Sequence, residues 1–402
     1  MFKDRSVVVN DLLRNVNNDY EQNILAKNYA MQSSDTIQTI SIYKLFVPLK
    51  EPFVISLGPI HHVQNVVIVI KTKQGITGFG ECSPYMTING ESVDTCFIVG
   101  QYFAKVLKGM DAVDIATCCD AMNKTIYANY SIKSAFDMAL HDIAAQHAGV
   151  PLYRFLGGKK DKILTTDMTV SIGAPKKMQQ DAIQFKAAGF PAIKVKLGED
   201  LDKDVARIKA IHEGIGDDIP LRIDANQGWQ TADNAIAVLN ALAPYNIEHC
   251  EEPIARWRFM ELSKVSVASP IPIMADESCG DHHDAERLIA LNACPMFNIK
   301  LGKTGGLSDA MKIVKLAAAA NMHLQIGGFM ESRLGMTAGA HLALSDAHIV
   351  HCDFDTPLMF TEDPVSGGIE YKQNGVIEVP DVPGLGAIIK EEYLNNAEQV
   401  TI

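Results

Sequence analysis

The sequence lacks a long apolar run and lacks an excess of positive charge. No stretch approaches the roughly 18–20 consecutive apolar residues that a membrane-spanning helix needs. The 36 Lys and Arg residues stand against 48 Asp and Glu residues, which gives a formal net charge of −12. A chain this acidic is not expected to bind nucleic acid or an anionic membrane surface. A small anionic ligand held by a few local cations is still compatible with this composition.

Cysteine is scarce and has no metal-binding pattern. Eight cysteines occur in 402 residues, none of them in a C-x-x-C pair, and Cys118 and Cys119 are adjacent. This spacing argues against structural zinc sites and dithiol redox sites. Most of the cysteines lie inside apolar segments, which favours reduced thiols and a cytoplasmic protein.

The pattern of apolar residues divides the chain into four parts. Residues 1–36 are polar and rich in Asn, and we expect an N-terminal extension without an assignable role. Residues 37–160 contain β-rich runs followed by helical periodicity, which predicts an α+β domain. Residues 161–360 alternate eight short apolar strands with seven amphipathic helices, which predicts an α/β barrel of the TIM type, with a doubly wound sheet as the alternative. Residues 361–402 are expected to pack back on the first domain.

Charged residues recur where the strands of the predicted barrel end. They are Lys194 and Lys196 on the second strand, Asp224 on the third, Glu251 on the fourth, Asp276 on the fifth, Lys300 on the sixth, and Asp353 and Asp355 on the eighth. From Lys196 to Lys300, each step along the chain is about one βα unit, so these side chains are expected to form a ring. In a TIM barrel this ring lies at the C-terminal face, where catalytic residues gather.

The chemistry of this ring points to a metal ion. Three carboxylates on neighbouring strands, Asp224, Glu251 and Asp276, would repel one another unless a cation joins them. An all-oxygen ligand set suits Mg²⁺. Lys196 and Lys300 would flank the ion from opposite sides, because the second and sixth strands of an eight-stranded barrel face each other. Any one of these residues alone could be a helix cap or a solvated side chain, but their shared register and spacing favour a site.

With these motifs in place, the chain resembles the muconate-lactonizing subgroup of the enolase superfamily over about residues 37–390. The motifs that carry the resemblance are KVK at 194–196, the Asp–Glu–Asp series, NIKLGKTGG at 298–306 and GGFMES at 327–332. The resemblance implies a modified barrel, (β/α)7β, under an α+β capping domain. It also implies Mg²⁺ on the three carboxylates, with Lys196 and Lys300 as paired acid and base catalysts.

The stretch DFD at 353–355 resembles the D-x-D signature of dipeptide epimerases, in which two aspartates hold the ammonium group of the substrate. This resemblance implies an isomerase that inverts the α-carbon of the C-terminal residue of a dipeptide by a two-base 1,1-proton transfer. Lys194 is expected to assist, because a neighbouring cation disfavours the charged form of Lys196 and offsets negative charge on the substrate. N-acylamino acid racemase, muconate cycloisomerase and o-succinylbenzoate synthase are alternatives within the fold. A non-catalytic Mg²⁺-binding barrel is the alternative of another class.

Two loops of the predicted capping domain are expected to contact the substrate side chain. Gly58, after Pro52–Phe53, falls about where epimerases for an Ala-Glu substrate typically carry a basic residue, and Ile55 is an apolar neighbour. Met330 and Glu331, in the strand-seven motif, are further substrate-binding candidates. Neither loop contains a Lys or Arg that would pair with a glutamate side chain, so the sequence predicts hydrophobic or aromatic dipeptides. The sequence does not specify the oligomeric state, and a homo-oligomer is compatible with it.

Overall fold

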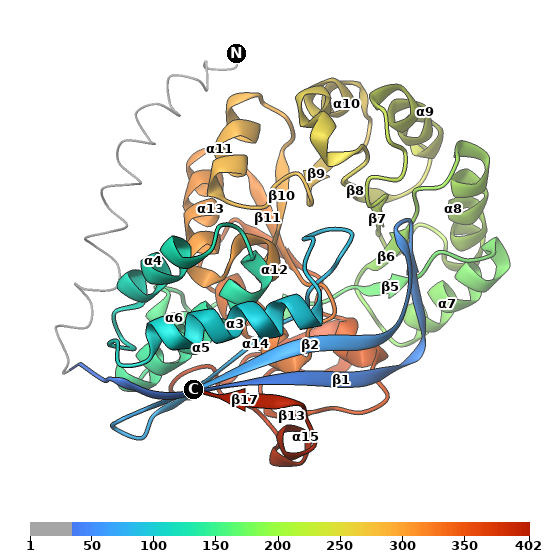
Figure 1. Cartoon of the computed structure of the whole chain (residues 1–402). Coiled ribbons are helices and arrows are strands. Elements are labelled where there is room, and N and C mark those ends of the chain that lie inside the picture. The colour runs from blue at the N-terminus through green and yellow to red at the C-terminus, as the bar shows by residue number, and fades with distance from the viewer. Residues whose placement is uncertain (1–33) are drawn as a thin grey trace.

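Alternating apolar residues build an antiparallel sheet near the start of the chain. The computed structural model describes residues 34–402, and it places β1 (Ile37–Ile55), β2 (Gly58–Thr72) and β3 (Thr77–Cys82) in a meander (Figure 1). Ile40 and Ile42 of β1 are fully buried, as a strand with one apolar face requires. The extension predicted for residues 1–36 lies outside the described residues, apart from its last three.

Helices cover the buried face of this sheet and complete the capping domain. They are α3 (Val93–Leu107), α4 (Ile115–Thr125), α5 (Tyr130–His147) and the short α6 (Leu152–Phe155). The α5 helix lies directly against β3, and a Cβ atom at Gly80 would overlap the carbonyl oxygen of Ala135. A residue without a side chain is therefore needed in β3 where the helix backbone crosses it.

Eight parallel strands, with a helix between each consecutive pair, form the barrel (Figure 1). The strands are β5 (Met168–Val170), β6 (Ile193–Lys196), β7 (Leu221–Asp224), β8 (Ile247–Glu251), β9 (Ile273–Ala275), β10 (Met296–Lys300), β11 (His323–Gly327) and β12 (Ile349–Cys352). The helices are α7 (Pro175–Ala187), α8 (Leu201–Ile215), α9 (Ala232–Leu242), α10 (Leu262–Ala268), α11 (His282–Ala290), α13 (Leu307–Ala319) and α14 (Arg333–Ala343). A parallel bridge between Thr166 and Cys352 brings the first and last strands together. This arrangement confirms the (β/α)7β barrel and excludes the doubly wound sheet.

The strand register brings the charged residues to one level. Lys196 is paired with Asp224, and Asp224 is paired with Glu251, across β6, β7 and β8. Val195, next to Lys196, is fully buried in the apolar core. Because successive side chains of a strand point to opposite faces, Val195 packs outward while Lys194 and Lys196 point into the barrel.

The C-terminal segment contacts both parts of the molecule. Its elements are β13 (Val365–Gly367), β14 (Glu370–Tyr371), β15 (Val376–Glu378), β16 (Ala387–Ile389), α15 (Glu391–Asn395) and β17 (Gln399–Thr401). The β17 strand pairs with β1 at the edge of the capping sheet, whereas β15 pairs with β4 (Leu164–Thr165) beside the barrel. Short helical turns connect other elements: η1 (Arg256–Glu261), α12 (Leu301–Thr304), η2 (Thr356–Met359) and η3 (Gln373–Gly375). Within residues 34–402, no helix has both the length and the apolar content to cross a membrane.

Candidate active site

Three carboxylates meet at the C-terminal ends of neighbouring barrel strands. Asp224 ends β7, Glu251 ends β8 and Asp276 follows β9, and all three side chains are completely buried. Each offers an oxygen atom within 4.8 Å of the oxygens of the other two. Three buried negative charges at this separation need cations, and the all-oxygen donor set fits Mg²⁺. The structure therefore brings the predicted metal ligands together.

Two lysines reach this carboxylate group from different sides. Lys196 Nζ lies 2.6 Å from Asp224 Oδ2, and Lys300 Nζ lies 2.7 Å from Asp276 Oδ2. The lysines come from β6 and β10, which are four strands apart in a barrel of eight and so lie opposite each other. Burial alone would lower the pKa of Lys300, but the combined negative charges of Asp276, Glu251 and Asp224 outweigh burial and raise that pKa.

Lys194 lies deeper in the barrel than Lys196. Its Nζ atom is 2.9 Å from Glu251 Oε1 and 2.7 Å from Asp353 Oδ2, and the side chain is buried. Burial would lower the pKa of Lys194, but the carboxylates of Asp353 and Glu251 outweigh burial and raise that pKa. Lys194 is thus a charge partner of two carboxylates, and it is not among the residues that line the inner pocket described below.

Further polar residues, which the sequence analysis did not identify, donate hydrogen bonds to the carboxylates of Glu251 and Asp276. Asn298 Nδ2 and Gln325 Nε2 donate hydrogen bonds of 3.0 Å and 2.7 Å to Glu251. Lys303 Nζ donates to Asp276 Oδ1 at 2.6 Å. Asn298 precedes Lys300 by two residues, so the two-residue period of a strand would have placed it on the same face. Lys303 belongs to the short helix α12, and no periodic signal in the sequence marks it.

A second group of carboxylates closes another side of the site. Asp353 and Asp355, after β12, lie with Asp167 so that one oxygen of each is within 4.8 Å of the others. Asp355 Oδ2 accepts a hydrogen bond of 2.6 Å from the backbone N–H of Thr169. Burial raises the pKa of Asp355 to about 7, and the charge of Asp353 adds to this rise. The sequence analysis did not identify Asp167, which lies before β5 rather than at the end of a barrel strand.

A small inner pocket joins the lysines to the D-x-D residues. Its cavity volume is about 40 Å³. The lining residues are Phe53, Ile55, Ile60, Tyr85, Ile88, Thr169, Lys196, Asn226, Lys300, Gly328, Phe329, Met330, Asp353, Asp355 and Thr356. Both predicted catalytic lysines, both D-x-D carboxylates and the predicted contacts Ile55 and Met330 therefore share one cavity.

A larger outer hollow of about 320 Å³ adjoins this pocket under the capping loops. Ile60, Tyr85 and Met330 line both spaces, and Gly58 lines only the outer one. Glu331 lines neither space, since its Oε2 accepts a 2.6 Å hydrogen bond from the N–H of Phe329. Burial raises the pKa of Glu331 to about 7. The structure thus places Glu331 behind the wall of the pocket.

Comparisons with known proteins agree with this geometry. Residues 177–393 match the family described as "Enolase C-terminal domain-like", and residues 37–157 match the N-terminal domain of the mandelate racemase and muconate lactonizing enzyme family. A D-Ala-D/L-Ala epimerase of Cytophaga hutchinsonii is 56% identical over 366 residues, which cover 91% of this chain and 99% of that protein. An L-Ala-D/L-Glu epimerase of Clostridium acetobutylicum is 36% identical, covering 90% of this chain and 99% of that protein.

A solved structure gives the same result in three dimensions. The crystal structure of the dipeptide epimerase from Cytophaga hutchinsonii, complexed with Mg and the dipeptide D-Ala-L-Val, superposes with a TM-score of 0.90 at 56% identity. The superposition covers 91% of this chain and all of that one. This similarity extends through both the capping domain and the barrel.

Proposed function

The chain belongs to the enolase superfamily, in the branch of mandelate racemase and muconate lactonizing enzyme, and on that premise we propose that it is a dipeptide epimerase. The reaction inverts the α-carbon of the C-terminal residue of a dipeptide. The observation that carries the proposal is the inner pocket, in which Lys196 and Lys300 lie on opposite strands while Asp353 and Asp355 close a third side. The names of the relatives above agree with this activity.

The carboxylates of Asp224, Glu251 and Asp276 would hold Mg²⁺. When bound, Mg²⁺ stabilises the negative charge that develops when a proton leaves the carbon next to a carboxylate. The described residues fit such an ion, because the three carboxylates are buried and converge within 4.8 Å.

The two lysines would move the proton. Lys196, on β6, and Lys300, on β10, approach the pocket from opposite walls. One lysine, in its neutral form, accepts the α-proton from one face of the carbon, and the other, as an ammonium group, donates a proton to the opposite face. This exchange of roles inverts the configuration, and the reverse reaction uses the lysines in the opposite order.

The D-x-D carboxylates would select the free amino terminus. Asp353 and Asp355 line the pocket, and Asp167 lies beside them. An ammonium group suits such a group of carboxylates through charge-assisted hydrogen bonds. An N-acylated substrate has no positive charge to offer here, which disfavours the N-acylamino acid racemase alternative. The same argument disfavours the cycloisomerase and synthase alternatives.

The outer hollow favours an apolar side chain on the epimerised residue. Among the described residues that line it, Leu57, Pro59, Ile60 and Met86 are apolar. None of these described residues is Lys or Arg, and the basic side chains among them are the imidazoles of His61 and His62. A buried glutamate side chain would therefore lack the ammonium or guanidinium partner that Lys or Arg provides, and burying it without one costs several kcal/mol. This favours dipeptides such as Ala-Ala or Ala-Val over Ala-Glu.

We also infer a cytoplasmic location, because all eight cysteines are free thiols and seven of them are buried. A reducing compartment keeps thiols in this state. Assembly into a homo-oligomer stays a prediction.

The test is a dipeptide panel incubated with the enzyme and Mg²⁺ in D₂O, with deuterium uptake followed by mass spectrometry. We expect uptake into D-Ala-L-Ala and D-Ala-L-Val, and a kcat/KM at least about 10-fold lower for L-Ala-L-Glu and for N-acetyl-D-Ala-L-Ala. Chelation of the metal should stop uptake, and restoring Mg²⁺ should recover it. Equal turnover of the N-acetylated compound would overturn the assignment of the D-x-D residues, and a preference for L-Ala-L-Glu would overturn the apolar specificity.

A further inference from the structure

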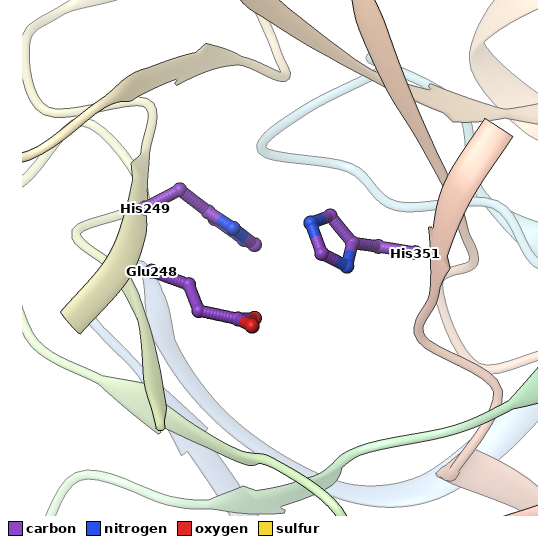
Figure 2. Close-up of side chains that lie close together, drawn as sticks. All are labelled: Glu248, His249 and His351. Carbon is purple, nitrogen blue, oxygen red and sulfur yellow. The ribbon is translucent and has the colours of Figure 1, made fainter. Parts of the chain in front are cut away.

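A second group of possible metal ligands lies in the barrel, nearer the N-terminal ends of the strands than the carboxylate site. The side chains of Glu248 and His249, on β8, and His351, on β12, point toward one another (Figure 2). Each offers one ligand atom within 4.8 Å of the ligand atoms of the other two. The imidazole rings of His249 and His351 are 5.2 Å apart between centroids. Since β8 and β12 are four strands apart, this group spans the barrel.

Irregular strand pairing brings these side chains inward. Between β7 and β8 the register skips Glu248, because Leu221 pairs with Ile247 and Arg222 pairs with His249. A bulge of this kind lets two successive residues of one strand, Glu248 and His249, reach the same side. Between β11 and β12 the register skips Val350 in the same way and turns His351 toward the interior. The cluster is therefore built by two local departures from regular pairing.

The imidazole of His249 is buried without a hydrogen-bond partner in the described part of the chain, which indicates a ligand site. Its side chain is completely buried, and neither Nδ1 nor Nε2 has a hydrogen-bond partner among residues 34–402. Its Nε2 atom lies 3.7 Å from Glu251 Oε1, which is beyond hydrogen-bond distance. Burying a polar group without a partner is costly. A metal ion coordinated by one of these nitrogens would remove part of that cost.

Arg222 is the competing cation at this place. It donates to Glu248 Oε2 at 2.8 Å, to His351 Nδ1 at 2.9 Å and to Asp167 Oδ2 at 3.0 Å. Arg222 thus already pairs with Glu248 and Asp167, so a second cation here has to share Glu248 with Arg222. Because an arginine N–H can only donate, His351 Nδ1 accepts from Arg222, and this imidazole is the neutral tautomer with its proton on Nε2. A neutral imidazole has one lone pair on a ring nitrogen, and in His351 this lone pair accepts the hydrogen bond from Arg222. A metal ion that binds this nitrogen must therefore displace Arg222 from His351. Arg222 would still pair with the carboxylates of Glu248 and Asp167.

We propose that Glu248, His249 and His351 form a second metal site that binds a late first-row divalent ion, with Zn²⁺ as the representative. Two imidazoles and one carboxylate are the donor set that Zn²⁺ prefers, whereas Mg²⁺ prefers oxygen atoms alone. The side chain of Glu248 is 34% exposed, which gives the ion a route from solvent. Because β8 and β12 lie on opposite sides of the barrel, the bound ion joins the two walls and stabilises the folded state by mass action.

The first test is calorimetric titration of Zn²⁺ into the full chain in excess Mg²⁺, with Asp224→Asn as a second background that disables the carboxylate site. We expect one Zn²⁺ per chain in both backgrounds. Glu248→Gln, His249→Gln and His351→Gln should each weaken its Kd at least ~10-fold. His348→Gln removes an imidazole outside the cluster and should leave the Kd unchanged.

The second test keeps the proposal falsifiable if a histidine variant folds poorly. Zn²⁺ should raise the unfolding temperature of the wild-type protein and of His348→Gln, but not that of Glu248→Gln, in which only a partly exposed carboxylate is changed. Absence of Zn²⁺ binding in excess Mg²⁺ would overturn the proposal. So would Zn²⁺ binding that persists in all three cluster variants and is lost in Asp224→Asn, because the ion would then occupy the carboxylate site.

Discussion

At the scale of single residues, the two pocket lysines are distinguished by their partners and by the walls they come from. Lys196 pairs with Asp224 and lies 5.9 Å from the ring of Phe53, whereas Lys300 pairs with Asp276 and lies 5.0 Å from the ring of Phe329. Each lysine therefore has one carboxylate and one aromatic face that fix its position. This symmetry fits a reaction in which either lysine can serve as the base.

The corresponding prediction concerns Lys196→Ala and Lys300→Ala. Each variant should lose epimerisation by at least about 10²–10⁴-fold, because one of the two proton-transfer groups is gone. Each should still exchange the α-proton of one epimer with D₂O, using the remaining lysine, and the two variants should act on opposite epimers. Mass spectrometry of the separated epimers measures this.

The matched control is Lys264→Ala, which removes an exposed lysine of α10 and should leave both activities intact. Near-normal epimerisation by either pocket variant would contradict the two-base mechanism. Exchange of the same epimer by both variants would contradict the placement of the lysines on opposite faces.

The residues that sequence reasoning identified share a periodic signal. Lys196, Asp224 and Glu251 each end a strand about one βα unit after the last, so spacing alone placed them in one ring. Asp167 and Lys303 carry no such signal, because one precedes a strand and the other lies in a four-residue helix. Their importance follows from three-dimensional contacts with Asp353, Arg222 and Asp276, which no single segment of sequence contains.

At the scale of elements, α14 is joined to its neighbours by a buried imidazole. His341 Nδ1 accepts a 3.1 Å hydrogen bond from the backbone N–H of Tyr153, in α6, and its Nε2 lies 3.1 Å from the carbonyl oxygen of Leu385. Because Nδ1 accepts, the ring is the neutral tautomer with its proton on Nε2. Burial lowers the pKa of His341 to about 4. Protonation would place a second N–H against the Tyr153 N–H, so this contact between α6 and α14 depends on pH.

The prediction is that His341 makes the protein less stable as the pH falls. Its ordinary pKa of 6.5 applies to the unfolded chain, so between pH 6.5 and 4 the unfolded state binds a proton that the native state does not. The free energy of unfolding therefore decreases through this window, by about 2 kcal/mol between pH 7 and pH 5 from this residue alone.

Urea unfolding at pH 7 and pH 5 of the wild type and His341→Gln measures this contribution. Glutamine cannot titrate, so the stability of the variant should change less between the two pH values, by about 2 kcal/mol. Equal pH dependence in the wild type and His341→Gln would contradict the prediction.

The order of helices and strands was predictable from the sequence, but the register in which the barrel strands pair was only partly predictable. The repeated alternation of short apolar strands and amphipathic helices after residue 160 predicted the barrel, and the (β/α)7β fold is confirmed. The resemblance to the enolase superfamily is confirmed as well. The register shifts at Glu248 and Val350 were not predicted, because a bulge is a property of two paired strands and not of either one.

At the scale of the whole molecule, one of the clamps between the capping domain and the barrel is the buried carboxylate of Glu81. Glu81, in β3, accepts hydrogen bonds from Ser332 Oγ at 2.7 Å, from the N–H of Gly335 at 3.0 Å and from Asn65 Nδ2 at 2.7 Å. Asn65 also donates to the carbonyl oxygen of Met330 at 2.9 Å. Met330 lines both the inner pocket and the outer hollow. One connected network thus links the cap to a residue that lines the substrate site.

The last prediction follows from this network. In Glu81→Gln the side chain keeps its shape, but one acceptor oxygen becomes an N–H₂ group that faces the N–H and hydroxyl donors of Ser332. Leaving buried donors without an acceptor should cost about 1–3 kcal/mol of unfolding free energy. Because the loop that carries Met330 loses its anchor, kcat/KM should fall about 10-fold, mainly through KM, while both lysines still exchange the α-proton.

Urea unfolding and steady-state kinetics with D-Ala-L-Ala separate the two effects. The matched control is Glu398→Gln, which changes an exposed carboxylate near β17 that pairs with Lys44 and should alter neither quantity. A Glu81→Gln protein with wild-type stability and wild-type KM would show that the other contacts between cap and barrel, such as the hydrogen bonds that Asp137 accepts from Leu307 and Ser308, hold the cap without Glu81. A loss of stability with an unchanged KM would show that the clamp holds the two domains together without shaping the pocket. A loss of stability together with a higher KM would show that Glu81 couples the cap to the substrate site. A buried carboxylate that only stabilises the fold would change the stability alone.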